Sequence, residues 1–337
     1  MKIKKRLVSF LQSDFRWKLI KLSKIIKINL YPKKFNLSNY THKIIFNFIF
    51  NEKSQKIKKI ISQNIIEQQK YSKKNLKFLV SPPGSGSTFV RCMLSSYFEI
   101  FYGIGNGIPK FNNITNEWIF SGSPILSSDL FNSIIIDESL NKNNTNKYFS
   151  KKEFYKNVIF FTRYPYKNSK IDLHNFNNSK FIVLFREPYD WMISQYTRYE
   201  KKNYVDKKIV NVIMIKESLN YLKAYYDFWL KYSKLNKTKV LFIDYKILTT
   251  KSNKAFFEIC KFINYKISNK ELINNCVKYN SKRYSLKLIK TKFEGTRFSN
   301  SNERNKIKTK ISKHLNKEIK NLNFEKIYKD LLKRVVI

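Results

Sequence analysis

The feature that most constrains how this chain folds is a short apolar segment joined by a glycine- and serine-rich turn to an amphipathic segment. Residues 76–81 (LKFLVS) have the length and composition of a buried β-strand. The turn at residues 82–88 (PPGSGST) follows directly. Apolar residues then recur at helical spacing, at Val90, Met93, Leu94, Tyr97 and Phe101. A strand, a tight turn and a helix in this order predict a parallel α/β unit with a loop suited to binding an anion.

Further apolar runs extend this pattern along the chain. Residues 158–162 (VIFFT), 181–185 (FIVLF) and 240–243 (VLFI) are also predicted to form short buried strands. A long helical pattern lies between the last two runs. Strands that alternate with helices predict an α/β fold, in which a parallel sheet is flanked by helices on both faces. Residues 103–152 are rich in Asn, Ser and Gly, so we expect a loop-dominated insertion that faces the substrate.

The chain divides into two parts. A length of 337 residues suffices for one large core, which we place in residues 76–337. Residues 1–75 are basic, carry apolar residues at helical spacing, and are expected to form a helical N-terminal extension. This extension either lies on a membrane surface or packs on the main domain as an ordinary helix. Neither a run of about 18 apolar residues nor a secretory signal pattern is present. We therefore expect a cytoplasmic location, with peripheral contact at a membrane surface if the extension lies there.

The net charge of +43 has a compositional explanation. Only ten of the 67 basic residues are arginine, and the lysines accompany many Asn, Ile, Phe and Tyr residues. This combination is typical of an AT-rich genome, so we expect no specific nucleic-acid partner, although a chain this cationic attracts polyanions at low salt. Three widely spaced cysteines, and three histidines outside metal-ligand spacing, predict neither a disulfide framework nor a metal site.

The glycine- and serine-rich turn has the chemistry of a phosphate cradle. A turn that enters a helix leaves backbone N–H groups unpaired, and the helix dipole adds positive potential at the same place. Gly84 and Gly86 let the backbone approach an anion closely, and the hydroxyls of Ser85, Ser87 and Thr88 add donors. An ordinary tight turn with a serine N-cap is the alternative interpretation. The lysine of G-x-x-x-x-G-K-[ST] is missing from the turn, which disfavours a P-loop NTPase.

Two segments together resemble the donor-binding motifs of PAPS-dependent sulfotransferases. Residues 83–91 (PGSGSTFVR) are similar to that family's 5′-phosphosulfate loop, P-K-S-G-[TN]-T-W-x-R. Residues 180–196 (KFIVLFREPYDWMISQY) are similar to its 3′-phosphate motif, in which Arg186 and Ser194 have the required spacing of eight residues. An Arg at the carboxyl edge of a parallel strand points into the crevice where such sheets bind ligands, and its planar fork suits phosphate. A surface ion pair between Arg186 and one of the two carboxylates next to it is the alternative.

The resemblance implies a P-loop-NTPase-like sulfotransferase fold and a site for the nucleotide PAPS or its product PAP, without a metal. It assigns donor binding to nine residues: Gly84, Ser85, Gly86, Ser87, Thr88, Phe89, Arg186, Ser194 and Tyr245. Tyr245 is included because residues 240–248 (VLFIDYKIL) are similar to the family's strand with a Tyr near the adenine, although Lys246 replaces an acidic residue there. Gly295 and Arg297 are matched to the late segment that closes over the 3′-phosphate.

Two departures from the family's pattern affect the chemistry. Gly84 stands where the family usually has the loop Lys, so the loop amides and another cation must stabilise charge on the leaving PAP. Some relatives with the loop P-G-x-G-N-T-W, including sulfotransferase domains associated with WSC modules, share this replacement. Arg163, in residues 161–165 (FTRYP), stands where the family's Lys-Thr-His-x-Pro segment has its basic His. Arg cannot act as a base at neutral pH, so we assign Arg163 to the charge of the sulfonate or of an anionic acceptor, with a purely structural role as the alternative.

Three functions follow from these patterns. The leading hypothesis is a sulfotransferase that moves a sulfuryl group from PAPS to a hydroxyl of an acceptor, a glycan or a lipid being the classes considered. Its catalytic base remains open among Asp137, Glu138, Asp172 and His174. The replacements at Gly84 and Arg163, together with Phe161 at the lysine position of the Lys-Thr-His-x-Pro segment, favour an alternative, a catalytically impaired nucleotide-binding protein of the same fold. A basic protein that binds nucleic acid or a membrane surface is the third, supported by the charge alone.

Overall fold

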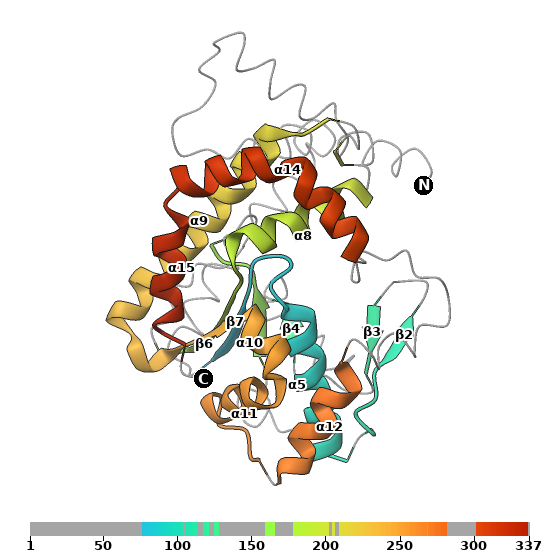
Figure 1. Ribbon diagram of the computed structural model, residues 1–337. Coiled ribbons are helices and arrows are strands. Elements are labelled where there is room, and N and C mark those ends of the chain that lie inside the picture. Colours follow the sequence, from blue (N-terminus) through green and yellow to red (C-terminus); the bar gives the residue numbers. More distant parts are fainter. Residues whose placement is uncertain are drawn as a thin grey trace, which may run out of the picture.

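The computed structural model describes most of the chain from residue 76 onward (Figure 1). The described residues are 76–103, 105–112, 117–120, 125–127, 159–165, 178–201, 204–205, 209–267, 269–281 and 301–335. The predicted extension, residues 1–75, lies outside them, so its helical character, its membrane contact and its boundary with the main domain remain predictions. None of the described helices combines the length and the apolar character that a membrane span requires.

A parallel sheet forms the centre of the fold. From edge to edge its five strands are β4 (Ile125–Ser127), β5 (Ile159–Thr162), β1 (Lys77–Val80), β6 (Lys180–Phe185) and β7 (Val240–Asp244). Every neighbouring pair of strands is parallel. The prediction of a parallel α/β fold is confirmed, and the four predicted strands agree with β1, β5, β6 and β7 to within one residue at each end.

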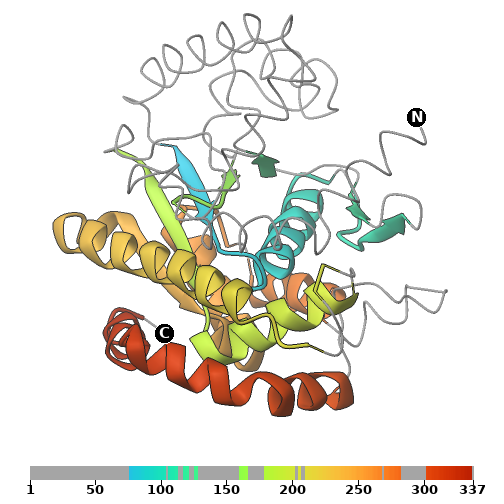
Figure 2. The same cartoon turned by 90° about the horizontal axis from the view of Figure 1, so that it is seen from above.

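Helices cover both faces of the sheet, as the view from above shows (Figure 2). One face carries α8 (Pro188–Lys201), α9 (Val212–Leu235), α14 (Ser301–Asn321) and α15 (Phe324–Leu332). The opposite face carries α5 (Ser87–Phe101), α11 (Ser252–Phe262) and α12 (Lys270–Asn280). The short helix α10 (Tyr245–Thr250) directly follows β7, and a 3₁₀ turn (Lys237–Lys239) precedes that strand.

The central strands are apolar over most of their length because both of their faces are buried, and the charged residues Lys77, Lys180 and Asp244 lie at strand ends. In β1, Phe78 and Val80 belong to the apolar cluster beneath α8, α9, α14 and α15, whereas Leu79 belongs to the cluster beneath α5, α11 and α12. All three side chains are fully buried. Side chains alternate between the two faces of a strand, so a central strand of a doubly covered sheet reads as a continuous apolar run.

The predicted insertion at residues 103–152 contains more regular structure than expected. Its described residues form β2 (Lys110–Asn112) and β3 (Glu117–Ile119), which pair as an antiparallel hairpin, and β4, which joins the main sheet beside β5. Each of these strands has three residues, which is too short for alternation of polar and apolar residues to be recognised. These three short strands were not predicted, and most of the segment expected to be loop-dominated lies outside the residues that the structure describes.

Two tyrosines of α9 hold the carboxyl ends of the central strands. The hydroxyl of Tyr225 donates to the carbonyls of Val80 and Leu184, at 3.2 and 3.1 Å. The hydroxyl of Tyr226 accepts from the backbone N–H of Arg186 at 3.2 Å and donates to the carbonyl of the same residue. Burial raises the pKa of both hydroxyls well above its usual value, so both stay protonated as donors. The sheet edge that carries both predicted motifs is thereby fixed in place.

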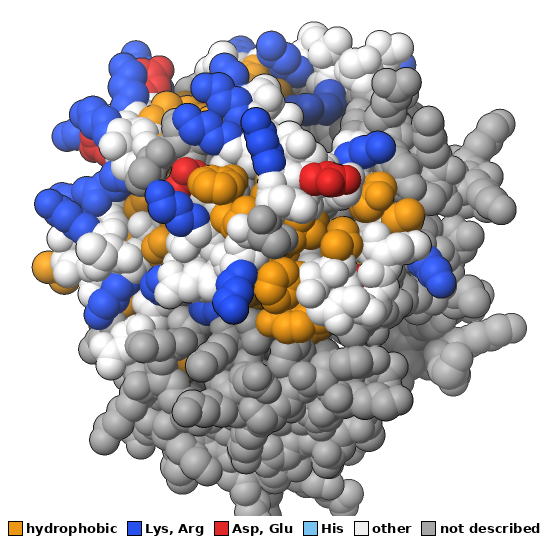
Figure 3. All heavy atoms as spheres, turned by 90° about the horizontal axis from the view of Figure 1, so that it is seen from below, with side chains coloured by type: hydrophobic (Ala, Val, Ile, Leu, Met, Phe, Trp, Pro, Cys, Tyr) orange, Lys and Arg blue, Asp and Glu red, His pale blue; other side chains and the backbone are white. Residues whose placement is uncertain are grey.

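Basic side chains occur at several places on the described part of the molecule. Figure 3 shows lysine and arginine side chains dispersed over the described part of one face, with few acidic side chains among them. Helices α11 and α12 contribute exposed lysines at Lys254, Lys261, Lys270 and Lys278. This distribution fits the compositional explanation of the charge, and it gives the surface a general attraction for anions.

Candidate active site

The turn between β1 and α5 requires glycine at two positions. Gly84 and Gly86 have φ angles of 79° and 89°, in the left-handed region that L-residues rarely adopt. A Cβ atom at Gly84 would lie 2.4 Å from Nε2 of Gln195, and one at Gly86 would lie 2.7 Å from Cδ2 of Leu248. A side chain at either position would therefore have a strained backbone and would displace the end of a neighbouring side chain, Gln195 of α8 or Leu248 of α10.

Donors from β6 and α8 bind the carbonyl groups of the turn. Pro83 O accepts from Trp191 Nε1 at 2.6 Å and from Gln195 Nε2 at 2.9 Å, and Gly84 O accepts from Arg186 Nη1 at 3.0 Å. In a planar trans peptide the N–H points away from the carbonyl. The N–H groups of Gly84 and Ser85 are therefore directed away from these donors, which leaves them for an anion at the N-terminus of α5.

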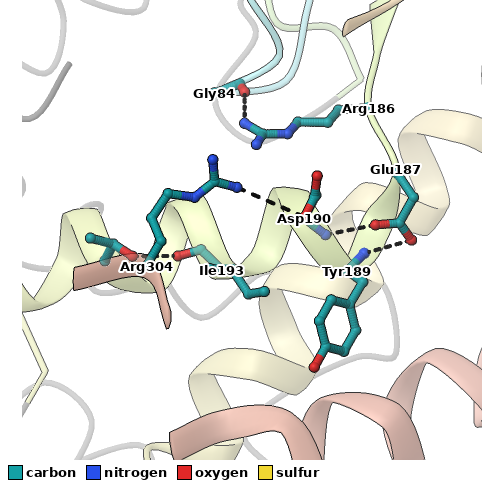
Figure 4. Close-up of polar contacts among 8 residues, drawn as sticks. Gly84, Arg186, Glu187, Tyr189, Asp190, Ile193 and Arg304 are labelled. Atoms are coloured by element: carbon teal, nitrogen blue, oxygen red, sulfur yellow. Dashed lines mark hydrogen bonds and ion pairs between the residues drawn. The ribbon is translucent and has the colours of Figure 1, made fainter. Parts of the chain in front are cut away.

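Arg186 lies at the carboxyl end of β6 and points at the turn (Figure 4). Its guanidinium carbon lies 4.2 Å from the centroid of the Tyr245 ring, and 5% of the residue's surface is exposed. Burial lowers the pKa of Arg186; Tyr245 and Asp190 raise it, and the charge of Arg304 lowers it. The guanidinium remains charged at neutral pH because its ordinary pKa is so high.

Two polar atoms at this place are buried without a partner. Neither the hydroxyl of Ser85 nor Nε of Arg186 makes a hydrogen bond to any residue that the structure describes. Buried polar groups are normally paired, and an unpaired one calls for an explanation. Here a hydroxyl from the first motif and a guanidinium N–H from the second lack partners in the same site, which fits a ligand with phosphate groups at both ends.

The other residues that were predicted to bind the nucleotide lie on the same turn or beside it. Ser87, Thr88 and Phe89 form the first turn of α5, where Ser87 is buried and Phe89 packs against the apolar cluster on that face. The hydroxyl oxygen of Ser194 lies 3.7 Å from the position of a Cβ at Gly84, and Cδ2 of Tyr245 lies 3.1 Å from that of a Cβ at Gly86. The structure thus brings all nine predicted positions together, although their roles in binding remain predictions.

Arg163 follows β5 and is half-buried. Its guanidinium carbon lies 5.4 Å from the centroid of the Phe161 ring, and that of Arg91 lies 4.9 Å from the same centroid. Two cations thus share one aromatic ring beside the sheet edge. Arg91 was given no role from the sequence, although it closes the motif at residues 83–91.

Several predicted residues lie outside the part of the chain that the structure describes. They are the four candidate bases and the two residues of the late segment: Asp137, Glu138, Asp172, His174, Gly295 and Arg297. Their roles remain predictions. Among the residues that are described, no group of three or more His, Cys, Asp and Glu side chains is arranged to hold a metal ion. The three cysteines are buried and are not joined in disulfides.

The carboxylates next to Arg186 have other partners. Glu187 accepts from the backbone N–H groups of Tyr189 and Asp190, at 3.0 and 2.7 Å, and so caps the start of α8. Asp190 Oδ1 lies 3.8 Å from Nη2 of Arg304 on α14 (Figure 4). The alternative in which Arg186 forms a surface ion pair is therefore wrong, because Arg186 is buried and its guanidinium donates to the carbonyl of Gly84 in the turn. No signal in the sequence indicated that Trp191, Gln195 or Arg304 belongs to the site, because each contacts a residue more than 100 positions away in the chain.

A comparison with protein families identifies the chain. The family model described as "Sulfotransferase domain" matches residues 74–336. The chain belongs to the sulfotransferase family. This membership confirms the predicted family, its α/β fold and sulfuryl transfer as the activity; it does not specify the acceptor.

This sulfotransferase also overlaps with solved structures of low sequence identity. One is a retinol dehydratase in complex with androsterone and inactive cofactor PAP, with 14% identity, a TM-score of 0.48, and coverage of 77% of this chain and 85% of the other. A mouse sulfotransferase complexed with PAP has 13% identity and a TM-score of 0.42, covering 81% and 94%. A sulfotransferase domain from the curacin biosynthetic pathway has 16% identity and a TM-score of 0.32, covering 71% and 97%. No curated protein sequence matches this one.

Proposed function

We propose that this sulfotransferase takes its sulfuryl group from PAPS and transfers it to a hydroxyl of its acceptor. One observation carries the proposal. Arg186 of the second motif donates to Gly84 of the first at 3.0 Å, and the neighbouring Ser85 hydroxyl and Arg186 Nε have no partner among the described residues. PAPS, when bound, supplies an activated sulfuryl group on its 5′-phosphate and carries a 3′-phosphate at its other end. The glycine turn and Arg186 offer donors for both ends.

Each group of residues has a separate task in this proposal. The turn amides and the hydroxyls of Ser85 and Thr88 bind the 5′-phosphosulfate, and the helix dipole of α5 supports charge that develops there. Arg186 and Ser194 bind the 3′-phosphate. Tyr245, which packs under the Arg186 guanidinium, lies on the side of the turn where the adenine is expected. Because Gly84 has no charge, these groups must stabilise the leaving nucleotide without a loop lysine.

The arginines beside Phe161 support an acceptor that carries negative charge near its hydroxyl. Arg91 and Arg163 both contact that ring, and the surface as a whole is strongly basic. An acidic glycan or an anionic lipid headgroup has this chemistry, and the lipid would agree with membrane contact through residues 1–75. A hydroxyl acceptor of either class is therefore the substrate to test first, by transfer of labelled sulfate from PAPS.

Substitution of Arg186 tests the donor site. Arg186→Ala removes a charge-assisted contact worth about 1.5–3 kcal/mol, so PAP affinity should fall by about tenfold or more. In wild-type protein, PAP at 100 times its Kd should raise the free energy of unfolding by about 2.7 kcal/mol. Arg198→Ala removes an arginine from the last turn of α8 and serves as the control. Equal PAP affinity in the two variants, measured by calorimetric titration, would remove the donor assignment.

Substitution of Arg163 separates an active enzyme from the impaired nucleotide-binding protein. If Arg163 acts on the sulfonate or the acceptor, Arg163→Ala should keep PAP affinity within about twofold and lower turnover by tenfold or more, as loss of one charge-stabilising donor does. PAP binding without any sulfate transfer by the wild-type chain would support the impaired alternative, which the departures at Gly84 and Arg163 favour. Normal turnover of the variant would leave Arg163 with a structural role.

A further inference from the structure

A second arginine points at the place where Arg186 meets the glycine turn. Arg304 lies in the first turn of α14, and its side chain extends over α8 toward Asp190 and the space beside Arg186 (Figure 4). The charge of Arg304 is one of the causes that lower the pKa of Arg186, after the larger effect of burial. Two like charges on elements far apart in the sequence therefore act on each other in one small region.

This arrangement costs free energy in the protein without a ligand. A cation in the first turn of a helix faces the positive end of the helix dipole, which disfavours it. The positive charge of the nearby Arg186 guanidinium disfavours the charge of Arg304 further. Arg304 pairs with Asp190 at 3.8 Å, with side chains 36% and 58% exposed, and such an exposed pair contributes little. An anion between Arg186 and Arg304 would relieve both repulsions.

Helix α14 holds the base of Arg304 in a fixed position against α8. Lys310 Nζ lies 2.6 Å from Glu200 Oε1, and Lys201 Nζ lies 2.7 Å from Glu303 Oε2. On the inner side of α14, the buried residues Ile307, Ile311 and Leu315 pack into the core. Arg304 can thus change its partner by rotation of its own side chain, without movement of the helix.

We propose that Arg304 is a second ligand of the nucleotide's 3′-phosphate and that Asp190 is its internal competitor. This inference rests on the proposed function, which places the 3′-phosphate beside Arg186 and Ser194. In the empty site Arg304 pairs with Asp190. When a 3′-phosphate enters, Arg304 exchanges the carboxylate for the phosphate, so that two guanidinium groups face one dianion. Arg304 then determines specificity for a nucleotide with a 3′-phosphate, and Asp190 lowers its affinity.

The test compares PAP with 5′-AMP, which lacks the 3′-phosphate, by calorimetric titration. Arg304→Gln should lower PAP affinity by about tenfold and change 5′-AMP affinity by less than about twofold. Asp190→Asn should raise PAP affinity several-fold and leave 5′-AMP unchanged, because it removes the competing carboxylate. Lys308→Gln removes one charge from the next turn of α14 and should alter neither affinity.

Each outcome bears on a separate statement. Equal PAP affinity in Arg304→Gln and Lys308→Gln, or equal losses for PAP and 5′-AMP, would overturn the role of Arg304. Weaker PAP binding in Asp190→Asn would contradict the proposal that Asp190 and the 3′-phosphate compete for Arg304. It would mean that Asp190 instead holds Arg304 in the position that binds the phosphate. Failure of the wild-type protein to prefer PAP over 5′-AMP would instead remove the proposed function itself. These results are distinguishable in one set of titrations.

Discussion

At the scale of single residues, the site is marked by polar atoms that the protein leaves unsatisfied. Ser85 Oγ and Arg186 Nε are buried and have no partner in the described part of the chain. An unsatisfied buried group costs about 1–3 kcal/mol. Natural folds tolerate such a cost where a ligand supplies the missing partner, and this fits the place of Ser85 on the turn and of Arg186 beside it, where the nucleotide is proposed to bind.

Ser85 offers a prediction in which stability and binding change in opposite directions. Ser85→Ala removes an unsatisfied hydroxyl, so the free energy of unfolding should stay the same or rise by about 1 kcal/mol, whereas PAP affinity should fall by about tenfold. Ser96→Ala is the control, because Ser96 Oγ donates to Gly107 O at 2.6 Å and accepts from Asn280 Nδ2 at 2.7 Å. That variant should lose stability and keep PAP affinity. Urea unfolding and titration would show the opposite pattern if the Ser85 hydroxyl were structural.

At the scale of elements, the glycine turn takes its shape from its neighbours. Its carbonyls are held by Trp191, Gln195 and Arg186, and its two glycines lie against α8 and α10. This contact gives a physical reason for the departure from the family's loop at Gly84. With a φ of 79° and Gln195 Nε2 at 2.4 Å from a Cβ position, a lysine at this place would have a strained backbone and would displace the Gln195 amide from Pro83 O.

Substitution of two glycines separates the effect of the contact between the turn and Gln195 from the effect of a positive φ angle. Gly84→Ala and Gly103→Ala both put an L-residue at positive φ, at a cost of about 1–2 kcal/mol each. Nothing lies within 4 Å of a Cβ at Gly103, whereas at Gly84 the alanine must displace the Gln195 amide that binds Pro83 O. We expect Gly84→Ala to lose PAP binding by more than tenfold and Gly103→Ala to retain it. Similar PAP affinities of the two folded variants would show that the contact with α8 is unimportant.

At the scale of the whole molecule, the end of the sheet opposite the site carries a buried charge. Lys77 and Lys180 are paired across β1 and β6, and Lys77 Nζ lies 5.0 Å from the centroid of the Tyr265 ring. Burial, with a smaller contribution from Lys180, lowers the pKa of Lys77 to about 8. Below pH 8 the folded protein therefore carries this charge at a cost in stability. Between pH 8 and the ordinary lysine pKa of 10.5, the unfolded chain binds more protons at this residue than the folded protein does, so Lys77 makes stability rise with pH.

Lys77→Met should remove this cost. We expect the free energy of unfolding at pH 7 to rise by about 1–3 kcal/mol, after allowance for the residual exposure of the amine. The difference between variant and wild type should shrink as the pH rises from 8 to 10.5 and vanish above that range. Lys254→Met, at an exposed position on α11, should show no such convergence. Thermal unfolding across this pH range measures both, and a constant difference for Lys77→Met would contradict the buried charge.

Much of the fold follows from local patterns in the chain. Four buried strands were predicted to within one residue at each end because each is an apolar run bounded by turn residues. The strands β2, β3 and β4 were missed because three residues give no pattern. None of the helices α11, α12, α14 and α15 was predicted, although apolar residues at helical spacing, such as Ile307, Ile311 and Leu315 in α14, are a signal that could have indicated them.

The sequence by itself determined the parallel α/β unit, the glycine turn, the arginine at the end of a strand and the family. These depend on residue type and spacing within short segments, where covalent geometry limits the choices. Only the tertiary structure decided that Arg186 faces Gly84, that Trp191 and Gln195 hold the turn, and that Arg304 and Asp190 lie beside it. Those contacts join residues 102 to 114 positions apart. Chain segments so distant meet through packing of the whole core, and no local pattern encodes that packing.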